Sequence, residues 1–515
     1  MSRGRSLVGA LALAALLSAP LSAQGSSYEE WQRLSAVVAH IRANYADSVT
    51  DHQLVRAAID GVLRALDPHS WFLTTADNDR RNALERGELA VTGIALDLAD
   101  GIPTVLEVVD ASPADHGGVR SGDRVLAIDG TSIAGLNARA IALRLAGEKG
   151  SKVRVLLERG PRLDPDSVSV TLKREMAAPK RSVRVARLLD GATGYLRLGE
   201  FGAQSADEVR SAIKKLRGSK ASRLVLDLRG NPGGIVTEAV TMASTFLPDS
   251  VLVFSTKGRQ KTVNKEYRTN GGGTFKDLPL VVLIDQGSAS AAEALTASLQ
   301  DHDRAIVAGR RSFGKALMQT GFNVPDGYVQ LTIGHVISPS GRYIQRPYSG
   351  LKLEQYYAFA GDSAWQDTTR TFKSDHGRIV HGGGGVAPDV TLPSPPSLPR
   401  WFTVAADSGW DRAVADSVGF SLGTDEAARV AWQAGSATWA DRLLPPLLSR
   451  VRARLGLAVQ PDEATRAAIS RRLAARAAKV RWGDDASEEL TLSADPDIVA
   501  AVALFARSGE ILGGH

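Results

Sequence analysis

Two serines lie one residue apart at a predicted strand-to-helix corner. The apolar run LPLVVLID (278–285) is followed by DQGSASAAEA (285–294), which leads into a segment rich in helix formers. A corner of this kind can hold a hydroxyl next to the unpaired N–H groups of a helix start, which suits a nucleophile beside an oxyanion. Ser and Gly are also common before a helix as capping residues, so this stretch alone leaves both roles open for Ser288 and Ser290.

A lysine further along the chain has a setting that favours base catalysis. Lys315 and Gln319 lie four positions apart in RRSFGKALMQT (310–320), which places them on one face of either a helix or a strand. An exposed lysine usually only keeps the surface soluble. A lysine held between Phe313 and Leu317 in an apolar setting differs, because desolvation favours the neutral amine that can accept a proton.

A glycine-rich turn is the third candidate element. The stretch LVLDLRGNPGG (224–234) predicts a strand that ends in a polar turn with paired glycines. Because glycine has no Cβ, Gly233 and Gly234 let backbone N–H groups approach a ligand closely. A plain glycine-rich loop is the other interpretation of the same residues.

Several domains are needed to position these residues. Apolar residues at helical spacing in 28–68 predict two helices. Short β-type runs in 88–175 predict a compact β-rich domain, and alternating strands and helices in 190–393 predict an α/β layer. TLPSPPSLP (391–399) is typical of a linker, and the Ala- and Arg-rich remainder predicts a helical tail.

The N-terminus indicates export. Met1–Ala23 has arginines at positions 3 and 5, an apolar stretch too short to span a bilayer, and then SAPLSA, which is the layout of a secretory signal peptide. The chain has no cysteine, so neither disulfides nor a lipid-modified cysteine are expected. We therefore expect an exported protein in a periplasmic or extracellular compartment.

Composition and motifs argue against several other classes of function. The pI is near 9.4, but the arginines are scattered and form no basic stripe with interleaved aromatic residues, so nucleic-acid binding is not expected. No clustered His and Asp residues occur at metal-ligand spacing, and we expect neither a metal nor a cofactor.

The sequence lacks the full motifs of two other hydrolase types. A Ser-His-Asp hydrolase could use His302 with Asp285 or Asp303, but the G-x-S-x-G elbow is absent. Ser211 and Lys214 have the S-x-x-K spacing of penicillin-binding enzymes, but their S-D-N and K-T-G partners are absent.

The segment 88–175 resembles a PDZ domain. The stretches ELAVTGIALDL and VVDASPADHGGVRSGDRVLAIDGTSI carry the pattern of that family. The resemblance implies that Thr92, Gly93 and Ile94 form the turn and strand edge that capture the C-terminal carboxylate of a peptide. A structural β-domain with a tight turn is the alternative.

The motifs together resemble the C-terminal processing (tail-specific) serine proteases. The resemblance covers residues 28–393 and runs through LDPHSWFL, the PDZ segment, YLRLGEF, LDLRGNPGG, IDQGSASAAE, LQDHDRAIVAGRRSFGKALMQ, VQLTIGHVISPSGRYIQ and GVAPDV. It implies a multidomain α/β protein with a PDZ domain, a ClpP/crotonase-like Ser-Lys protease core and helical ends. The implied parts are a signal peptide (1–23), an N-terminal helical region (28–75), the PDZ domain (85–175), the core (180–393) and a C-terminal helical domain (400–515).

The family pattern implies a role for each candidate residue. Ser290 is implied to be the nucleophile, Lys315 the general base and Gln319 the residue that orients the lysine, with Ser288 as the rival nucleophile. The implied oxyanion donors are the N–H of Ala291 and that of either Gly233 or Gly234. Two departures from the pattern are Ala292, where the family commonly has another Ser, and VISPSG, which replaces a more aromatic stretch.

The implied function is a serine endopeptidase that cleaves exported proteins recognised by their free, apolar C-termini. A catalytically inactive PDZ scaffold that binds such C-termini is the alternative. The physiological substrate, the oligomeric state, a peripheral association with a membrane and the role of residues 400–515 stay open.

Overall fold

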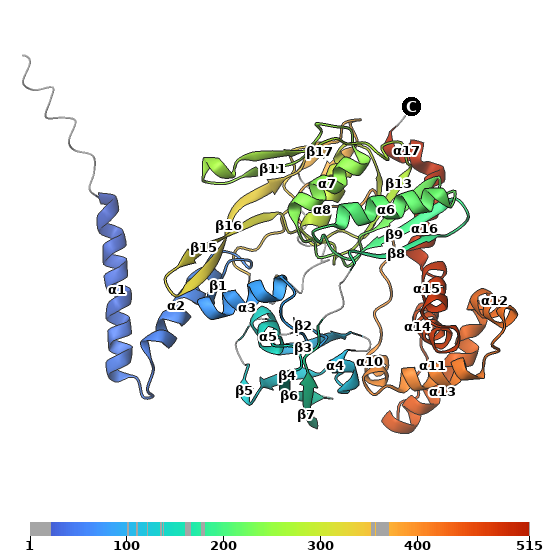
Figure 1. The fold of residues 1–515 in the computed structure, drawn as a ribbon, viewed down its shortest axis with the longest axis horizontal. Coiled ribbons are helices and arrows are strands. Elements are labelled where there is room, and N and C mark those ends of the chain that lie inside the picture. Colours follow the sequence, from blue (N-terminus) through green and yellow to red (C-terminus); the bar gives the residue numbers. More distant parts are fainter. Residues whose placement is uncertain are drawn as a thin grey trace, which may run out of the picture. The chain divides into compact units, whose positions relative to one another are not determined.

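The computed structural model describes residues 22–99, 102–109, 112–120, 122–133, 136, 138–159, 166–176, 181–351, 356 and 370–513. The chain divides between Phe72 and Leu73 into two compact units, whose helices and strands are labelled in Figure 1. The predicted signal peptide lies outside the described residues, apart from Ser22 and Ala23. No helix in the described part of the chain is both long enough and apolar enough to cross a membrane.

Two helices, α1 (Ser22–Asn44) and α2 (Asp51–Leu66), make up most of the first unit. α2 begins at a capping box, in which the side chains of Thr50 and Gln53 each accept the backbone N–H of the other. It ends just before Pro68, because the residue before a proline disfavours the helical conformation. The predicted N-terminal helical region is confirmed.

A β-rich domain with its own core follows in the second unit. β6 (Lys152–Arg159) buries every second side chain, Val153, Val155 and Leu157, as its alternating sequence predicts. The strand order is β2-β3-β4-β6-β7, with β5 beside β4, so β2 is an edge strand among the strands described. The other elements are β2 (Ile94–Ala99), β3 (Ile102–Val108), α4 (Pro113–His116), β4 (Arg124–Ile128), β5 (Thr131–Ser132), α5 (Ala138–Leu145) and β7 (Asp166–Lys173).

The core region contains a six-stranded sheet in the order β19-β14-β13-β10-β9-β8, in which all neighbours except β8 and β9 are parallel. The crossovers α6, α7 and α8 pack on one face of this sheet, against residues such as Leu226 and Val282. The predicted alternation of strands and helices is confirmed. The elements are β8 (Val183–Leu188), β9 (Thr193–Leu198), α6 (Ser205–Gly218), β10 (Arg223–Asp227), α7 (Val236–Phe246), β13 (Leu280–Ile284), α8 (Ala291–Asp301), β14 (Ile306–Gly309) and β19 (Val390–Thr391).

The end of the chain covers the opposite face of this sheet. Val225, Val281 and Leu283 alternate with the residues of the first face and pack with Ile498 and Leu504 of α16. Figure 1 shows these C-terminal helices, coloured red, beside the sheet. They are α15 (Asp484–Ser493), α16 (Pro496–Leu504) and α17 (Ser508–Leu512).

A second sheet includes two strands that precede β13 in the sequence and two that follow β14. β15 (Leu317–Val324) and β16 (Gly327–Ile337) form a long hairpin, and β16 also pairs with β11 (Leu252–Lys257), which pairs with β12 (Lys265–Arg268). The remaining short elements are β1 (Trp71–Thr74), α3 (Thr75–Glu85), β17 (Thr371–Lys373) and β18 (Ile379–His381).

A helical domain lies between the linker and α15. Trp439, Leu443 and Leu473 are among its fully buried side chains. The predicted helical tail is confirmed. Its helices are α10 (Arg400–Asp407), α11 (Trp410–Ser421), α12 (Glu426–Ala434), α13 (Ser436–Leu455) and α14 (Glu463–Trp482).

Candidate active site

Three connections meet at the carboxyl ends of β10, β13 and β14, the edge of a parallel sheet where ligands commonly bind. The N–H of Ala289 donates to the carbonyl of Asn231 (2.9 Å), and the N–H of Phe313 donates to the carbonyl of Ser288 (2.9 Å). These bonds join the glycine turn 228–235, the serine turn 285–290 and the loop 310–316. The three candidate elements of the sequence therefore lie together, although they are distant along the chain.

Ser290 is the N-cap residue of α8 and has an unusual backbone conformation. Its φ of 58° and ψ of −114° lie outside the regions that a residue with a side chain usually adopts. Such strain persists where surrounding contacts impose it, and it is frequent at catalytic positions. The side chain is half-buried at the sharp turn between β13 and α8.

Ser288 is fully buried, and its hydroxyl is already used. It donates to the carbonyl of Leu228 (2.8 Å) and accepts the N–H of Asp285 (3.0 Å). The hydroxyl of Ser288 thus joins the serine turn to the glycine turn, and a substrate cannot reach it without breaking these bonds.

Gly233 lies directly against the serine turn. A Cβ on Gly233 would come within 2.8 Å of Ser290 Cβ and 2.9 Å of Ala291 N. The N–H of Gly233 donates to the side-chain oxygen of Asn231 (2.9 Å). Within the part of the chain that the structure describes, no hydrogen bond occupies the N–H of Gly234 or that of Ala291.

Lys315 lies in the loop before β15 and is half-buried. The preceding Gly314 has a φ of 91°, and its carbonyl accepts the N–H of Arg346 (2.9 Å). The ring of Phe313 stands edge-on to the buried ring of Tyr356, with 5.6 Å between the ring centroids. The lysine therefore follows a loop that is fixed by both main-chain and aromatic contacts.

The position of the Gln319 side chain cannot be predicted from its four-residue spacing from Lys315. β15 starts at Leu317, and its pairing with β16 shifts register between Met318 and Gln319. A bulge of this kind re-aims side chains, so simple alternation cannot place Gln319 beside Lys315. The amide of Gln319 donates a hydrogen bond to the hydroxyl of Thr332, at 3.4 Å.

Glu293, in the first turn of α8, is a site residue that the sequence analysis missed. It is 1% exposed, and its Oε2 accepts the backbone N–H of both Ser290 (2.9 Å) and Lys315 (2.8 Å). Its Oε1 accepts the N–H of Gly314 (2.6 Å) and the hydroxyl of Ser312 (2.5 Å). One carboxylate therefore fixes the main chain of both candidate catalytic residues.

The electrostatics of Glu293 reflect this burial. Burial raises the pKa of its carboxyl group, although the hydrogen bonds from Ser312, Lys315, Gly314 and Ser290 favour the ionised form. The sequence did contain a signal, because Glu293 is the third residue after Ser290, the acidic position of an S-x-x-E capping box.

His302 lies at the other end of α8. Its Nδ1 contacts the carboxylate of Asp375 (2.7 Å), and its Nε2 contacts the carbonyl of Leu252 (2.7 Å). The length of α8 separates it from Ser290 by roughly 17 Å. A Ser-His-Asp triad of Ser290 with His302 is therefore excluded by distance.

In the β-rich domain, Thr92, Gly93 and Ile94 lie at the start of the edge strand β2. Gly93 has a φ of 84°, and a Cβ there would lie 2.3 Å from the side chain of Ser112, so the position requires glycine. Thr92 is 2% exposed, which leaves its backbone rather than its hydroxyl for a ligand. Among the described residues, the N–H groups of Thr92 and Gly93 have no hydrogen-bond partner.

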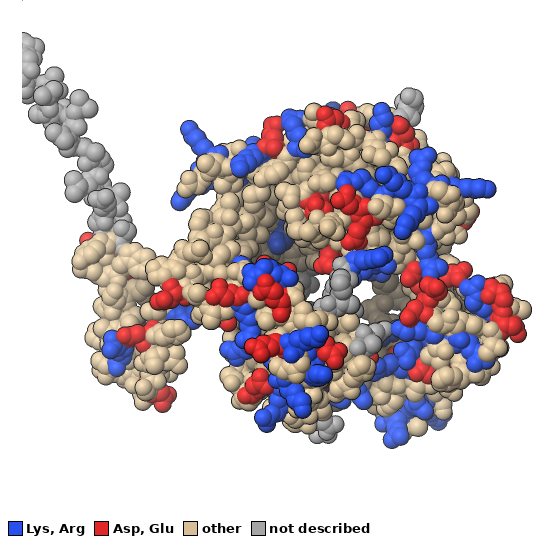
Figure 2. Space-filling view, in the orientation of Figure 1, with Lys and Arg blue, Asp and Glu red and all other residues tan. Residues whose placement is uncertain are grey.

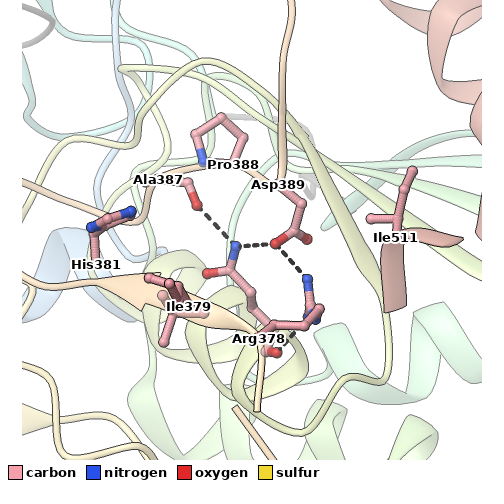
Figure 3. Close-up of a pocket in the computed structure, with 9 residues that line it drawn as sticks. Arg378, Ile379, His381, Ala387, Pro388, Asp389 and Ile511 are labelled. Carbon is pink, nitrogen blue, oxygen red and sulfur yellow. Dashed lines mark hydrogen bonds and ion pairs between the residues drawn. The ribbon is translucent and has the colours of Figure 1, made fainter. Parts of the chain in front are cut away.

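A separate pocket of about 380 Å³ lies near the C-terminal end of α8. Figure 3 shows that its polar groups bind one another: Arg378 donates to Asp389 (2.7 Å), as does the amide of Gln300 (2.8 Å). None of the candidate site residues lines it. The described residues contain no cluster of three His, Cys, Asp or Glu side chains suited to a metal ion.

Comparisons with known proteins agree with this layout. The profile of peptidase family S41 matches residues 192–354, and that of the PDZ domain matches residues 104–159. The carboxy-terminal-processing protease of Bartonella bacilliformis is 31% identical over 325 residues, which cover 62% of this chain and 74% of that protein. The carboxyl-terminal-processing protease of Synechocystis sp. is 33% identical over 299 residues, which cover 56% of this chain and 68% of that protein.

Among solved structures, the photosystem II D1 C-terminal processing protease has 26% sequence identity to this chain and a TM-score of 0.46. The match covers 70% of this chain and 86% of the D1 processing protease.

Proposed function

Because the chain belongs to peptidase family S41, as a C-terminal processing serine protease with a PDZ domain, we propose that it cleaves peptide bonds with Ser290 as the nucleophile and Lys315 as the general base. The observation that carries this proposal is the carboxylate of Glu293, which binds the backbone N–H of both residues through one oxygen atom. The two main-chain nitrogens are thus less than twice a hydrogen-bond length apart.

In the first half of the reaction, the neutral amine of Lys315 takes the proton of Ser290 Oγ as this oxygen attacks the carbonyl carbon of the scissile bond. The ammonium then gives this proton to the leaving amine, the C–N bond breaks, and an ester forms between Ser290 and the substrate. In the second half, Lys315 takes a proton from water as the water oxygen attacks the carbonyl carbon of the ester. The ammonium then returns this proton to Ser290 Oγ as the ester C–O bond breaks, which releases the new C-terminus and restores the enzyme.

The oxyanion that forms in both halves needs two N–H donors. The N–H of Ala291 is one, since it is unoccupied and lies at the start of α8. For the second donor, the structure favours Gly234, because the N–H of Gly233 already binds Asn231. Gly233 is needed for another reason: a side chain there would collide with Ser290.

Gln319 orients the lysine in this proposal by a hydrogen bond to its amine. Substrates are proteins or peptides whose free, apolar C-termini bind the PDZ domain at Thr92, Gly93 and Ile94, where unoccupied N–H groups meet an open strand edge. The predicted signal peptide supports an exported, periplasmic location. An inactive PDZ scaffold is not favoured, because the protease region itself matches the peptidase family.

The test is cleavage of an unfolded protein with a free apolar C-terminus by the purified chain, together with mass-spectrometric identification of the residue that a fluorophosphonate labels. We expect cleavage, and labelling at Ser290. Cleavage with the label on Ser288, or on no serine of this turn, would contradict the assignment of the nucleophile.

A further inference from the structure

The end of the chain is acidic where it meets the protease core. Arg187 of β8 pairs with Asp485 (2.9 Å) and Glu488 (2.7 Å) of α15. Asp495, the N-cap of α16, pairs with Arg229 (2.9 Å). In Figure 2, acidic side chains gather over α15 next to basic ones. These contacts add charge complementarity to the apolar packing of α16 on the sheet.

Asp497 makes the densest of these contacts. Its Oδ2 accepts hydrogen bonds from two arginines, Arg229 (2.8 Å) and Arg310 (2.6 Å), and its Oδ1 accepts a second bond from Arg310 (2.9 Å). The side chain of Asp497 is 9% exposed. Burial disfavours its charge, yet hydrogen bonds and positive charge from Arg310 and Arg229 hold the pKa of the carboxyl group below its usual value.

Arg229 and Arg310 are at the starts of the two loops that carry proposed catalytic groups. Arg229 directly follows Leu228, just after β10, and begins the turn that carries Gly233 and Gly234. Arg310 directly follows β14 and begins the loop that carries Lys315, and its own N–H binds the carbonyl of Ile284 (3.0 Å).

Arg229 is also tied from within the core. It binds the fully buried carboxylate of Asp227 (2.6 Å), which in turn accepts the hydroxyl of Tyr195 (2.7 Å). The guanidinium of Arg229 is thus shared between the central sheet and α16. Loss of the Asp497 carboxylate would leave Arg229 held by Asp227 and Asp495, and would remove both bonds from Arg310 to Asp497.

We propose that Asp497 is a positioning residue for the catalytic centre, a role that rests on the proposed use of Ser290 and Lys315. Its carboxylate binds both arginines and so fixes the starts of the glycine turn and of the Lys315 loop. The oxyanion donor of the glycine turn and the amine of Lys315 are thereby positioned next to Ser290. The end of the chain is then part of the active-site scaffold as well as a cover for the sheet.

Asn in place of Asp497 keeps the size of the side chain but removes the charge and one acceptor oxygen. The matched control is Glu488→Gln. Glu488 also lies near the end of the chain and binds an arginine of the core, Arg187, but Arg187 begins no catalytic loop. The full chain is used throughout. The measurements are kcat and KM on a peptide, the rate at which a fluorophosphonate labels Ser290, and the melting temperature.

We expect both variants to melt at a lower temperature than the wild type, and only Asp497→Asn to lose kcat. The loss should be about tenfold or more, with a matching decrease in the labelling rate, because small displacements of catalytic groups are costly. KM should stay within about threefold, since the interaction is not made with the bound substrate.

A folded Asp497→Asn variant with wild-type kcat would overturn the proposal. Equal losses of kcat in both variants would overturn it too, because they would show that the contact only stabilises the fold. If Asp497→Asn does not fold, Arg310→Lys takes its place, because it keeps the charge but loses the two-pronged contact. Wild-type kcat in Arg310→Lys would overturn the proposal too. A wild-type protein that neither cleaves nor labels at Ser290 would instead show that the proposed function is wrong, and the positioning role would fall with it.

Discussion

The proposed catalytic end of the central sheet and the proposed binding edge of the PDZ domain are built in opposite ways. At the catalytic end, buried polar side chains bind the main chain of the turns: Ser288 binds Leu228, Asn231 binds Gly233, and Glu293 binds both Ser290 and Lys315. At the PDZ edge, the N–H groups of the turn and the outer side of β2 have no partner in the described part of the chain.

This difference matches what each site has to do. A nucleophile and a base act only if their geometry is set before the substrate arrives, so their supports belong to the protein. A strand that is added to a sheet edge supplies the missing hydrogen bonds itself. Changes at the catalytic end should therefore lower kcat, and changes at the PDZ edge should raise KM.

The largest effect is expected for Ser290→Ala. Loss of the proposed nucleophile should lower kcat by at least about 10⁴-fold, which leaves only the rate enhancement that substrate binding and the oxyanion donors supply. Stability should fall by at most about 1 kcal/mol, the typical cost of a lost helix cap. Thermal melting and a peptide cleavage assay measure both quantities.

Ser288→Ala is the matched control for Ser290→Ala. It should remain largely active, but it should lose about 1–3 kcal/mol of stability, because two buried hydrogen bonds disappear. An inactive but stable Ser288→Ala variant beside an active Ser290→Ala variant would reverse the assignment of the nucleophile.

Lys315→Arg should lower kcat almost as far, by about 10³-fold. Arginine keeps the positive charge but cannot give up its proton, so it cannot act as a base. In the wild type, kcat should rise with pH through a single ionisation, since only the neutral amine accepts the proton of Ser290. A pH–rate profile tests the second expectation, and substantial activity in Lys315→Arg would rule out the general-base role.

Glu293→Gln should lower kcat about 10- to 100-fold with little change in KM. The amide has only one acceptor oxygen, so in either orientation its NH₂ group faces two of the four donors that the carboxylate now binds. Steady-state kinetics measure the effect. Glu208→Gln is the control, because Glu208 also accepts a backbone N–H, that of Val183, at a distance from the catalytic turns. Equal kcat in Glu293→Gln and the wild type would show that this carboxylate does not position the site.

The same substitution should change how stability depends on pH. The pKa of Glu293 is raised in the folded state, so the folded protein holds this proton more tightly than the unfolded chain does. The contribution of Glu293 to stability is therefore lost as the pH rises through the raised pKa. Denaturation at several pH values should show that this component is absent from Glu293→Gln.

The sequence predicted the helices and strands more completely than the hydrogen bonds that hold the candidate site residues in position. Alternation in β6, the parallel strands with their crossover helices and the helical ends all follow from local periodicity, because periodicity reports which face of an element is buried. The proximity of the serine turn, the glycine turn and the Lys315 loop followed only from the family resemblance. Their hydrogen bonds connect residues far apart in the sequence, and no local pattern encodes such pairs.

Glu293 and Asp497 show most clearly which residues the sequence alone does not identify. The capping-box spacing marks Glu293 only as a helix-start residue, and its role in the site is identified only when four donors from two loops converge on it. Asp497 lies in a tail whose role the sequence left open, and the structure shows that part of this tail packs on the central sheet. The bulge before Gln319 likewise depends on pairing with β16, which the spacing of Lys315 and Gln319 does not reveal.

The smallest expected effect concerns the PDZ edge, where amidation of the substrate's C-terminus should lower kcat/KM about tenfold, because a charge-assisted hydrogen bond to the carboxylate is lost. Most of the change should appear in KM, since the proposed role of the turn at Thr92 and Gly93 is to bind the tail and not the scissile bond. Gly93→Val should reproduce the loss for a substrate with a free C-terminus, because any Cβ there meets Ser112 at 2.3 Å and the φ of 84° suits only glycine.

A short peptide that reaches Ser290 without the PDZ domain is the control, and both changes should leave its cleavage unaltered. The comparison between the two regions predicts this difference, since the proposed role of Gly93 is to bind the tail, while Glu293 fixes the main chain of the two proposed catalytic residues. Matched substrates with free and amidated C-termini decide the matter. Equal kcat/KM for the two would mean that the open edge of β2 does not read substrate tails, and that the contrast between a closed catalytic end and an open binding edge has no functional meaning here.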